Sequence, residues 1–171
     1  MFDDHDDDED KNIEDMPLFK KGREIFELTS KIAELIPEDE EILHSYRGFM
    51  MEDAALLTVK VAGAEGVDLY DIKMENAAII RKAGRDLLTH CSGLKMLGFK
   101  ETHYLHLIRE AIEEYRLLFI DWVKSFDPWT YTIDRWGLFN PPGVGAHDHD
   151  PDDDLPFTGF PEDFDLDDDD D

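Results

Sequence analysis

The chain has 171 residues, of which 42% are hydrophobic, and a formal net charge of −26 at pH 7, so it is long enough for one domain with a hydrophobic core. Residues 1–16 hold nine acids and one Lys, and residues 141–171 hold 13 acids and no base, whereas residues 17–140 hold 21 acids and 16 bases. The basic residues form no block that could neutralise phosphates, which disfavours direct nucleic-acid binding, and no apolar run approaches the ~20 residues that span a bilayer.

The acidic segment at the start of the chain, residues 1–16, contains almost nothing to bury. Ordering it would cost ~1–2 kcal/mol per residue, so we expect a disordered N-terminal tail. The segment lacks the basic and then apolar pattern of a secretory signal, and the single cysteine, Cys91, allows no disulfide framework. These features predict a soluble protein in a reducing cytoplasm that makes no membrane contact.

Four segments have apolar residues at spacings of three and four, which is typical of amphipathic helices. The first starts at Pro17 and stops at Pro37. The second starts at Pro37, with four carboxylates in a first turn where the helix dipole favours negative charge, and ends at residues 63–66. The third and fourth, within residues 69–94 and 104–126, are joined by residues 97–99, and so short a joint makes them antiparallel neighbours. We therefore predict an all-α fold, an up-down antiparallel four-helix bundle over residues 17–127.

The same periodicity predicts which side chains are buried. In the fourth segment the buried stripe consists of Tyr104, Ile108, Ala111, Tyr115, Leu118, Trp122 and Phe126. Other side chains widen the stripes beyond what a single seam needs, which indicates subunit contacts and a homo-oligomer. They are Phe49, Leu56, Ile80 and Leu117.

An aromatic segment, residues 128–143, follows the last predicted helix. Its apolar side chains are Trp129, Tyr131, Ile133, Trp136, Leu138 and Phe139. Because the segment is too aromatic to leave in water, we expect it to pack on the bundle as a strap. Two prolines and a glycine at 141–143 then end the folded part, and residues 144–171 are expected to form a disordered acidic C-terminal tail.

Short motifs at the helix ends carry a family resemblance: Ile36-Pro37, Ala64-Glu65-Gly66, Leu97-Gly98-Phe99-Lys100 and Tyr104-Leu105. Over residues 19–126, their layout resembles the four-helix-bundle family of ribosomal-RNA intervening-sequence proteins and diversity-generating retroelement accessory proteins. The resemblance implies the bundle fold and assembly into a pentameric ring. The retroelement proteins have a basic surface suited to nucleic acid, whereas the helical segments of this chain are acidic, so the resemblance implies oligomerisation rather than nucleic-acid binding.

Histidines beside carboxylates are the candidate metal ligands. A di-iron bundle needs two Glu-x-x-His motifs and two further carboxylates, and only Glu41 with His44 has that spacing, at an exposed helix start. His103 and His106 lie three apart but lack an evident third ligand, and the run from His147 to Asp150 offers weak chelation at most. We therefore expect no metal site and no cofactor, with a metal-binding helical-bundle enzyme as the alternative.

Polar residues also occur inside the third helical stripe. Asn76 and His90 lie at heptad spacing, and His90 precedes Cys91. One hypothesis is a buried hydrogen-bonded pair that fixes helix register; the other is a Cys-His nucleophile. The first is favoured, because no Gly-rich oxyanion turn is nearby and thiols on core faces are usually inert. We expect no enzyme.

The C-terminal tail contains Asp-Asp-Asp-Leu-Pro-Phe at 152–157, which resembles the acidic tip of bacterial single-stranded-DNA-binding proteins. A second acidic and aromatic stretch follows at 157–166. The acids of the tail would steer a basic protein partner toward it, and the aromatic rings of the tail would give specificity. The predicted partner-binding residues are Asp152, Asp153, Asp154, Leu155, Pro156, Phe157, Phe160 and Phe164. A purely solubilising tail, or a mimic of that tip or of nucleic acid, are the alternatives.

The function predicted from the sequence is therefore that of a non-catalytic, self-associating helical-bundle interaction module with an acidic and aromatic tail that binds a basic protein.

Overall fold

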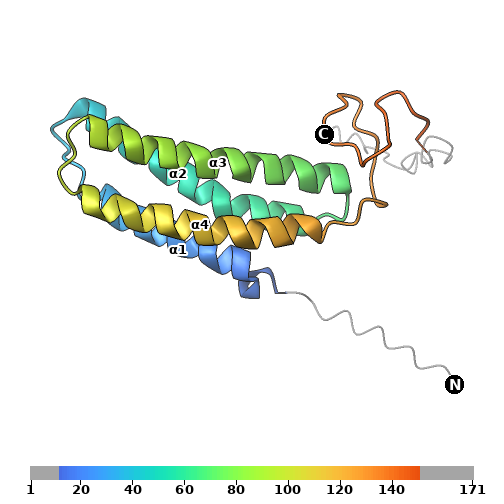
Figure 1. The fold of residues 1–171 in the computed structure, drawn as a ribbon, viewed down its shortest axis with the longest axis horizontal. Coiled ribbons are helices and arrows are strands. Elements are labelled where there is room, and N and C mark those ends of the chain that lie inside the picture. The colour runs from blue at the N-terminus through green and yellow to red at the C-terminus, as the bar shows by residue number, and fades with distance from the viewer. Residues whose placement is uncertain (1–11, 151–171) are drawn as a thin grey trace, which may run out of the picture.

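The protein is described here from a computed structural model, which describes residues 12–150. A short 3-10 helix, Ile13–Asp15, is followed by four long helices: α1 (Pro17–Ala33), α2 (Glu41–Glu65), α3 (Tyr70–Met96) and α4 (Thr102–Lys124). Successive helices are antiparallel, with connections at alternate ends (Figure 1). No strand occurs within residues 12–150. The predicted all-α four-helix bundle is confirmed.

The second helix begins later than the sequence indicates. Pro37 does not open α2, because the chain turns and bends between Ala33 and Glu40, and Glu40 is the N-cap residue. Only Glu41 lies in the first turn, so the expected group of four carboxylates at the helix start is wrong. Like charges repel within one helical turn, and the connection needs residues 34–40 to reverse the direction of the chain. Glu38 instead reaches Arg47, with 3.6 Å between Oε1 and Nη1.

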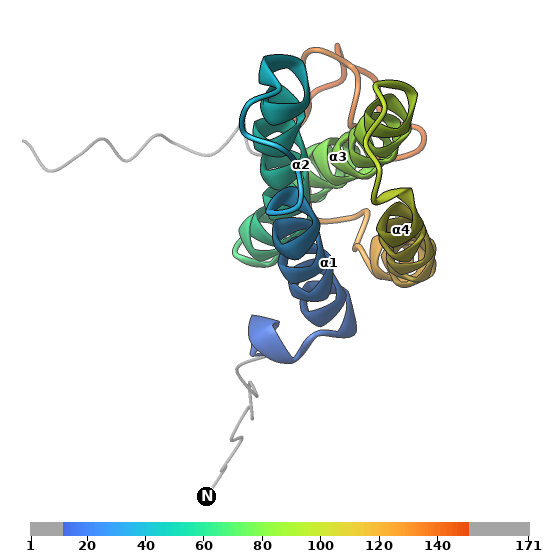
Figure 2. The ribbon, with the colours of Figure 1, turned by 90° about the vertical axis from the view of Figure 1, so that its left-hand side faces the viewer.

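The helices do not pack against one another equally. α1 lies beside α2 and α4, whereas α3 packs closely on α2 and more loosely on α4 (Figure 2). α1 approaches α2 closely at Gly22, where a Cβ would lie 3.1 Å from the carbonyl oxygen of Leu57. On the other side of α2, the ring of Tyr46 covers Gly93 of α3. These two glycines let α2 sit close to both neighbours.

The predicted buried stripes are largely correct, with one shift of a single residue in α4. In α4, Ile108, Ala111, Tyr115 and Trp122 are buried as expected. Tyr104 is 38% exposed and Leu105 is buried in its place, because at the first turn of α4 the Tyr104 ring lies against His103. The expectation that Ile80 widens an apolar stripe for subunit contacts is wrong, because its side chain is fully inside the core.

Among residues 12–150, no helix has both the length and the apolar character that a membrane crossing needs.

Candidate functional site

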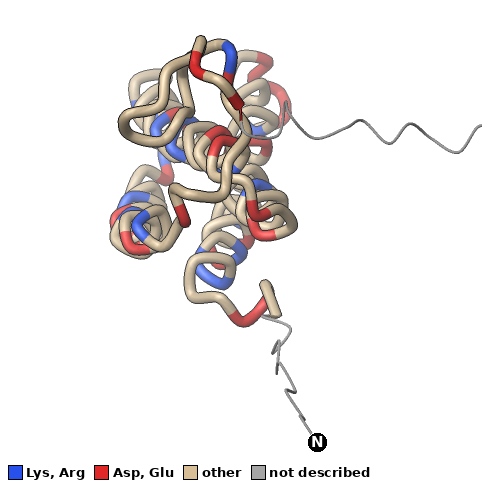
Figure 3. Tube along the Cα trace, turned by 90° about the vertical axis from the view of Figure 1, so that its right-hand side faces the viewer, with Lys and Arg blue, Asp and Glu red and all other residues tan. Residues whose placement is uncertain are grey.

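The chain after α4 forms a well-anchored loop, residues 127–150, which we call the tryptophan loop. It lies where α3 begins, at the end of the bundle that faces the viewer in Figure 3. The first backbone N–H of α3, on Tyr70, donates to the carbonyl oxygen of Thr130 at 2.7 Å. The buried carboxylate of Asp71 accepts from both the backbone N–H and the hydroxyl of Thr132, at 3.2 Å each. The loop thus satisfies donors and acceptors at the exposed start of a helix.

A single carboxylate, that of Asp134, organises the interior of the loop. It accepts the backbone N–H groups of Phe139 at 2.8 Å, Leu138 at 2.7 Å and Trp136 at 2.9 Å. These hydrogen bonds lower the pKa of Asp134, because they stabilise the ionised form. The side-chain amide of Asn140 binds the backbone of Asp134 at two points. It accepts the backbone N–H of Asp134 at 2.8 Å and donates to the carbonyl oxygen of Asp134 at 2.9 Å.

The second half of the loop is tied to the first. The guanidinium of Arg135 donates to the carbonyl oxygens of Ala146 at 3.1 Å and Asp148 at 2.8 Å. The carboxylate of Asp150 accepts the backbone N–H of Ile133 at 3.0 Å, and both residues are buried. The folded part of the chain therefore reaches Asp150, and the expected end of the fold at residue 143 is wrong for residues 144–150.

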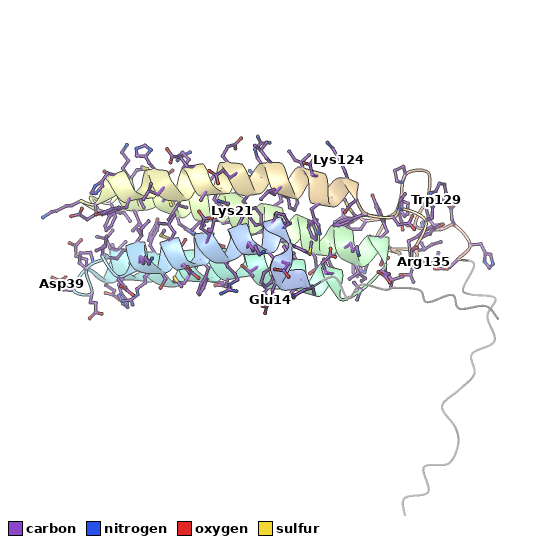
Figure 4. The ribbon with its side chains drawn as sticks, turned by 90° about the horizontal axis from the view of Figure 1, so that it is seen from below. Glu14, Lys21, Asp39, Lys124, Trp129 and Arg135 are labelled. Carbon is purple, nitrogen blue, oxygen red and sulfur yellow. The ribbon has the colours of Figure 1, made fainter. Side chains whose placement is uncertain are left out.

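Three large apolar side chains of this loop are in water, whereas Ile133 is buried. Trp129 is 85% exposed, Trp136 93% and Leu138 74%, so the expectation that the strap would bury them is wrong. The physical reason is local: the N–H groups of residues 136, 138 and 139 face the Asp134 carboxylate, and the side chains of Trp136 and Leu138 are left on the outside. Figure 4 shows Trp129 and Arg135 beyond the helix ends, far from Asp39 at the opposite end.

A partly buried polar pair joins α2 to α3. His90 Nδ1 lies 2.8 Å from Oδ2 of Asp53, and the imidazole stacks on Phe49 with 5.5 Å between ring centroids. Burial raises the pKa of Asp53, and the hydrogen bond with His90 partly opposes that rise. The polar pair that the heptad spacing suggested does not form, because Asn76 donates to the carbonyl oxygen of Ile72 within α3. Asp53 was not predicted as a partner, since nothing local distinguishes it on its apolar stripe.

The remaining predicted groups are not brought together. Cys91 is buried, and burial raises the pKa of its thiol to about 11, so the nucleophilic thiolate is scarce at neutral pH. His103 lies 3.8 Å from a carboxylate oxygen of Glu101. Within residues 12–150, no three His, Cys, Asp or Glu side chains are grouped so as to hold a metal ion.

The predicted partner-binding residues of the tail, residues 152–164, lie outside the described residues. The tryptophan loop was missed as a site, although one local signal exists: the run Asp-Arg-Trp-Gly at 134–137, with Asn140 after it, is typical of turns in which a carboxylate accepts nearby backbone N–H groups. Comparisons with protein-family models, with curated proteins and with solved structures gave no match for this chain.

Proposed function

We propose that this protein is a non-catalytic interaction module that self-associates through the tryptophan loop, and whose acidic tail binds a basic protein. One observation carries the proposal: Trp129, Trp136 and Leu138 are exposed on a loop whose backbone is fixed by hydrogen bonds. Tryptophan is enriched among the residues that dominate binding energy in protein interfaces. Holding such rings in place before binding reduces the entropy lost on association.

The partner that we assign to this loop is a second copy of the same chain. The resemblance to ring-forming four-helix bundles, stated above from the helix-end motifs, supports that choice, and the chain's place in that family is part of the proposal. Exposed apolar residues elsewhere, such as Phe49 and Leu117, add surface that could extend the contact. A cytoplasmic location belongs to the proposal as well, because a single reduced cysteine suits it.

Sedimentation velocity on the full chain tests self-association. The expected result is a sedimentation coefficient that rises with concentration in the micromolar range. Leu138→Ala should weaken association, because Leu138 lies on the tryptophan loop and is 74% exposed. Leu107→Ala is the matched control, since that side chain is 44% exposed on α4 and lies outside the proposed contact. A monomer throughout, or equal effects of the two variants, would contradict the proposal.

The alternative of a metal-dependent enzyme has its own test. It requires stoichiometric metal in the purified protein after dialysis, whereas an interaction module requires none. Elemental analysis of the same sample that is used for sedimentation distinguishes the two.

A further inference from the structure

An apolar groove of about 330 Å³ follows the seam between α3 and α4. It lies where these helices pack loosely, on the side of the molecule that faces the viewer in Figure 1. Apolar groups from both helices line it, namely Ile80, Gly84 and Leu88 of α3 and Ile112 and Phe119 of α4. Since Leu88 and Phe119 are only half-buried, the groove offers apolar surface that no part of residues 12–150 covers.

The rim of this groove is basic. Arg81 and Arg85 of α3 and Arg116 of α4 line it together with one acid, Glu113. Arg116 is paired with Glu113, at 2.9 Å from its Nε to Oε2, and among residues 12–150 Arg81 and Arg85 have no carboxylate within ion-pair distance. Farther along the same seam, Lys95 and Arg109 line a second depression. A chain with a net charge of −26 thus gathers unpaired cations beside apolar surface.

We propose that the acidic and aromatic segment of the same chain, residues 152–164, docks in the α3–α4 groove. Phe157 and Phe160 would occupy the apolar floor, and the carboxylates of the segment would face Arg81 and Arg85. The segment complements the groove in two respects: its aromatic rings suit the apolar floor, and its acids, with no base among them, suit the basic rim. Opposite charges at the rim of an apolar contact favour this pairing over other arrangements.

The length of the chain permits this docking. The last described residue, Asp150, is hydrogen-bonded to Ile133. The neighbouring Thr132 is hydrogen-bonded to Asp71 in the first turn of α3, so the loop ends near the start of that helix. Along α3, Ile80 lies about 14 Å beyond Asp71 and Gly84 about 20 Å beyond it, at 1.5 Å per residue. The seven residues from 151 to 157 span up to about 23 Å, and the ten to 160 up to about 33 Å. Both rings can therefore reach the groove from where the loop ends.

Docking within one chain has a consequence for the tail as a ligand. A basic partner would have to displace the tail from the groove, so the free protein would be less available for binding than a protein whose tail is undocked. The inference goes beyond the proposed function and does not depend on self-association, because it concerns a different face of the bundle.

Paramagnetic relaxation in the full chain tests the proposal. A spin label attached through Thr158→Cys should be selective, because the thiol of Cys91 is buried. We expect the backbone amide signals of Gly84, Leu88 and Phe119 to broaden, and those of Phe26 and Val59, on the opposite α1–α2 face, to stay sharp. Phe157→Ala with Phe160→Ala, and separately Arg81→Glu with Arg85→Glu, should each reduce the broadening several-fold.

The matched control is a label in the other acidic segment, through Asp8→Cys, because residues 1–16 are acidic but have one aromatic ring. This label should leave the groove signals unchanged. Equal broadening from both labels would reduce the effect to unspecific charge attraction and would overturn the proposal. Absence of broadening would do the same, as would broadening seen only when labelled and isotope-enriched chains are mixed. Sedimentation data on the same samples report on self-association separately.

Discussion

At the scale of single residues, one carboxylate determines the shape of the tryptophan loop. Asp134 accepts three backbone N–H groups, on residues 136, 138 and 139, and no apolar packing replaces them, since Trp136 and Leu138 are exposed. We predict that Asp134→Ala removes the hydrogen-exchange protection of these three amides, and that Asp134→Asn, which keeps one acceptor oxygen, removes part of it. Unchanged protection in the alanine variant would contradict this role.

The same group gives the loop a pH dependence whose direction follows from its pKa. Hydrogen bonds from the backbone hold the folded-state pKa of Asp134 below its ordinary value of ~3.9. Its stabilising contribution is therefore fully present above that ordinary value and is lost as the pH falls through the lower folded-state pKa. Protection factors of the Trp136, Leu138 and Phe139 amides should drop in that acidic window. The amide of Tyr70, which donates to a carbonyl oxygen, is the internal control.

At the scale of helices, the fold could be predicted because its signal is local and repeated. Apolar residues at spacings of three and four occur throughout each helix, so single exceptions do not hide the pattern. Neighbouring apolar residues are less predictable: whether Tyr104 or Leu105 enters the core depends on the contacts of the neighbouring helices. Helix ends are also uncertain, since the start of α2 is set by the turn after Pro37 and not by the carboxylates.

The candidate site could be predicted only in part, for a physical reason. The aromatic composition of residues 128–143 marked the segment, but the exposure of its rings depends on hydrogen bonds formed after folding. One of them joins Thr132 to Asp71, which are 61 residues apart, and no local pattern announces such a contact. The Asp53–His90 bond, between residues 37 apart, was missed for the same reason.

The close contact of α2 with α3 gives a test of helix packing. A Cβ at Gly93 would lie 2.7 Å from Oη and 2.9 Å from Cζ of Tyr46, so Gly93→Ala must displace that ring or separate the helices. We predict a loss of ~1–3 kcal/mol in the free energy of unfolding, measured by urea denaturation. Gly48→Ala is the matched control, because Gly48 lies inside α2 with nothing within 4 Å of a new Cβ. It should stabilise the protein by ~0.5–1 kcal/mol, and a similar loss at both sites would rule out the packing explanation.

At the scale of the whole molecule, charge acts in opposite directions on the two proposed contacts. Two copies that each carry a net charge of −26 repel one another, so association through Trp129, Trp136 and Leu138 has to overcome that repulsion. Docking of the acidic tail beside Arg81 and Arg85 is attractive instead. Salt should therefore distinguish the two contacts within one sample.

Raising the ionic strength from 0.1 M to 1 M shortens the screening length from about 10 Å to about 3 Å. We predict that the sedimentation coefficient at fixed protein concentration rises over this range, because repulsion between copies is screened while the apolar contact remains. Over the same range, the broadening of the Gly84 and Leu88 signals by the label at position 158 should fall. Arg85→Glu should abolish the second trend and leave the first. If the sedimentation coefficient and the broadening instead fell together as salt was added, self-association would depend on the docked tail. An apolar contact through the tryptophan loop would then be the wrong explanation of self-association.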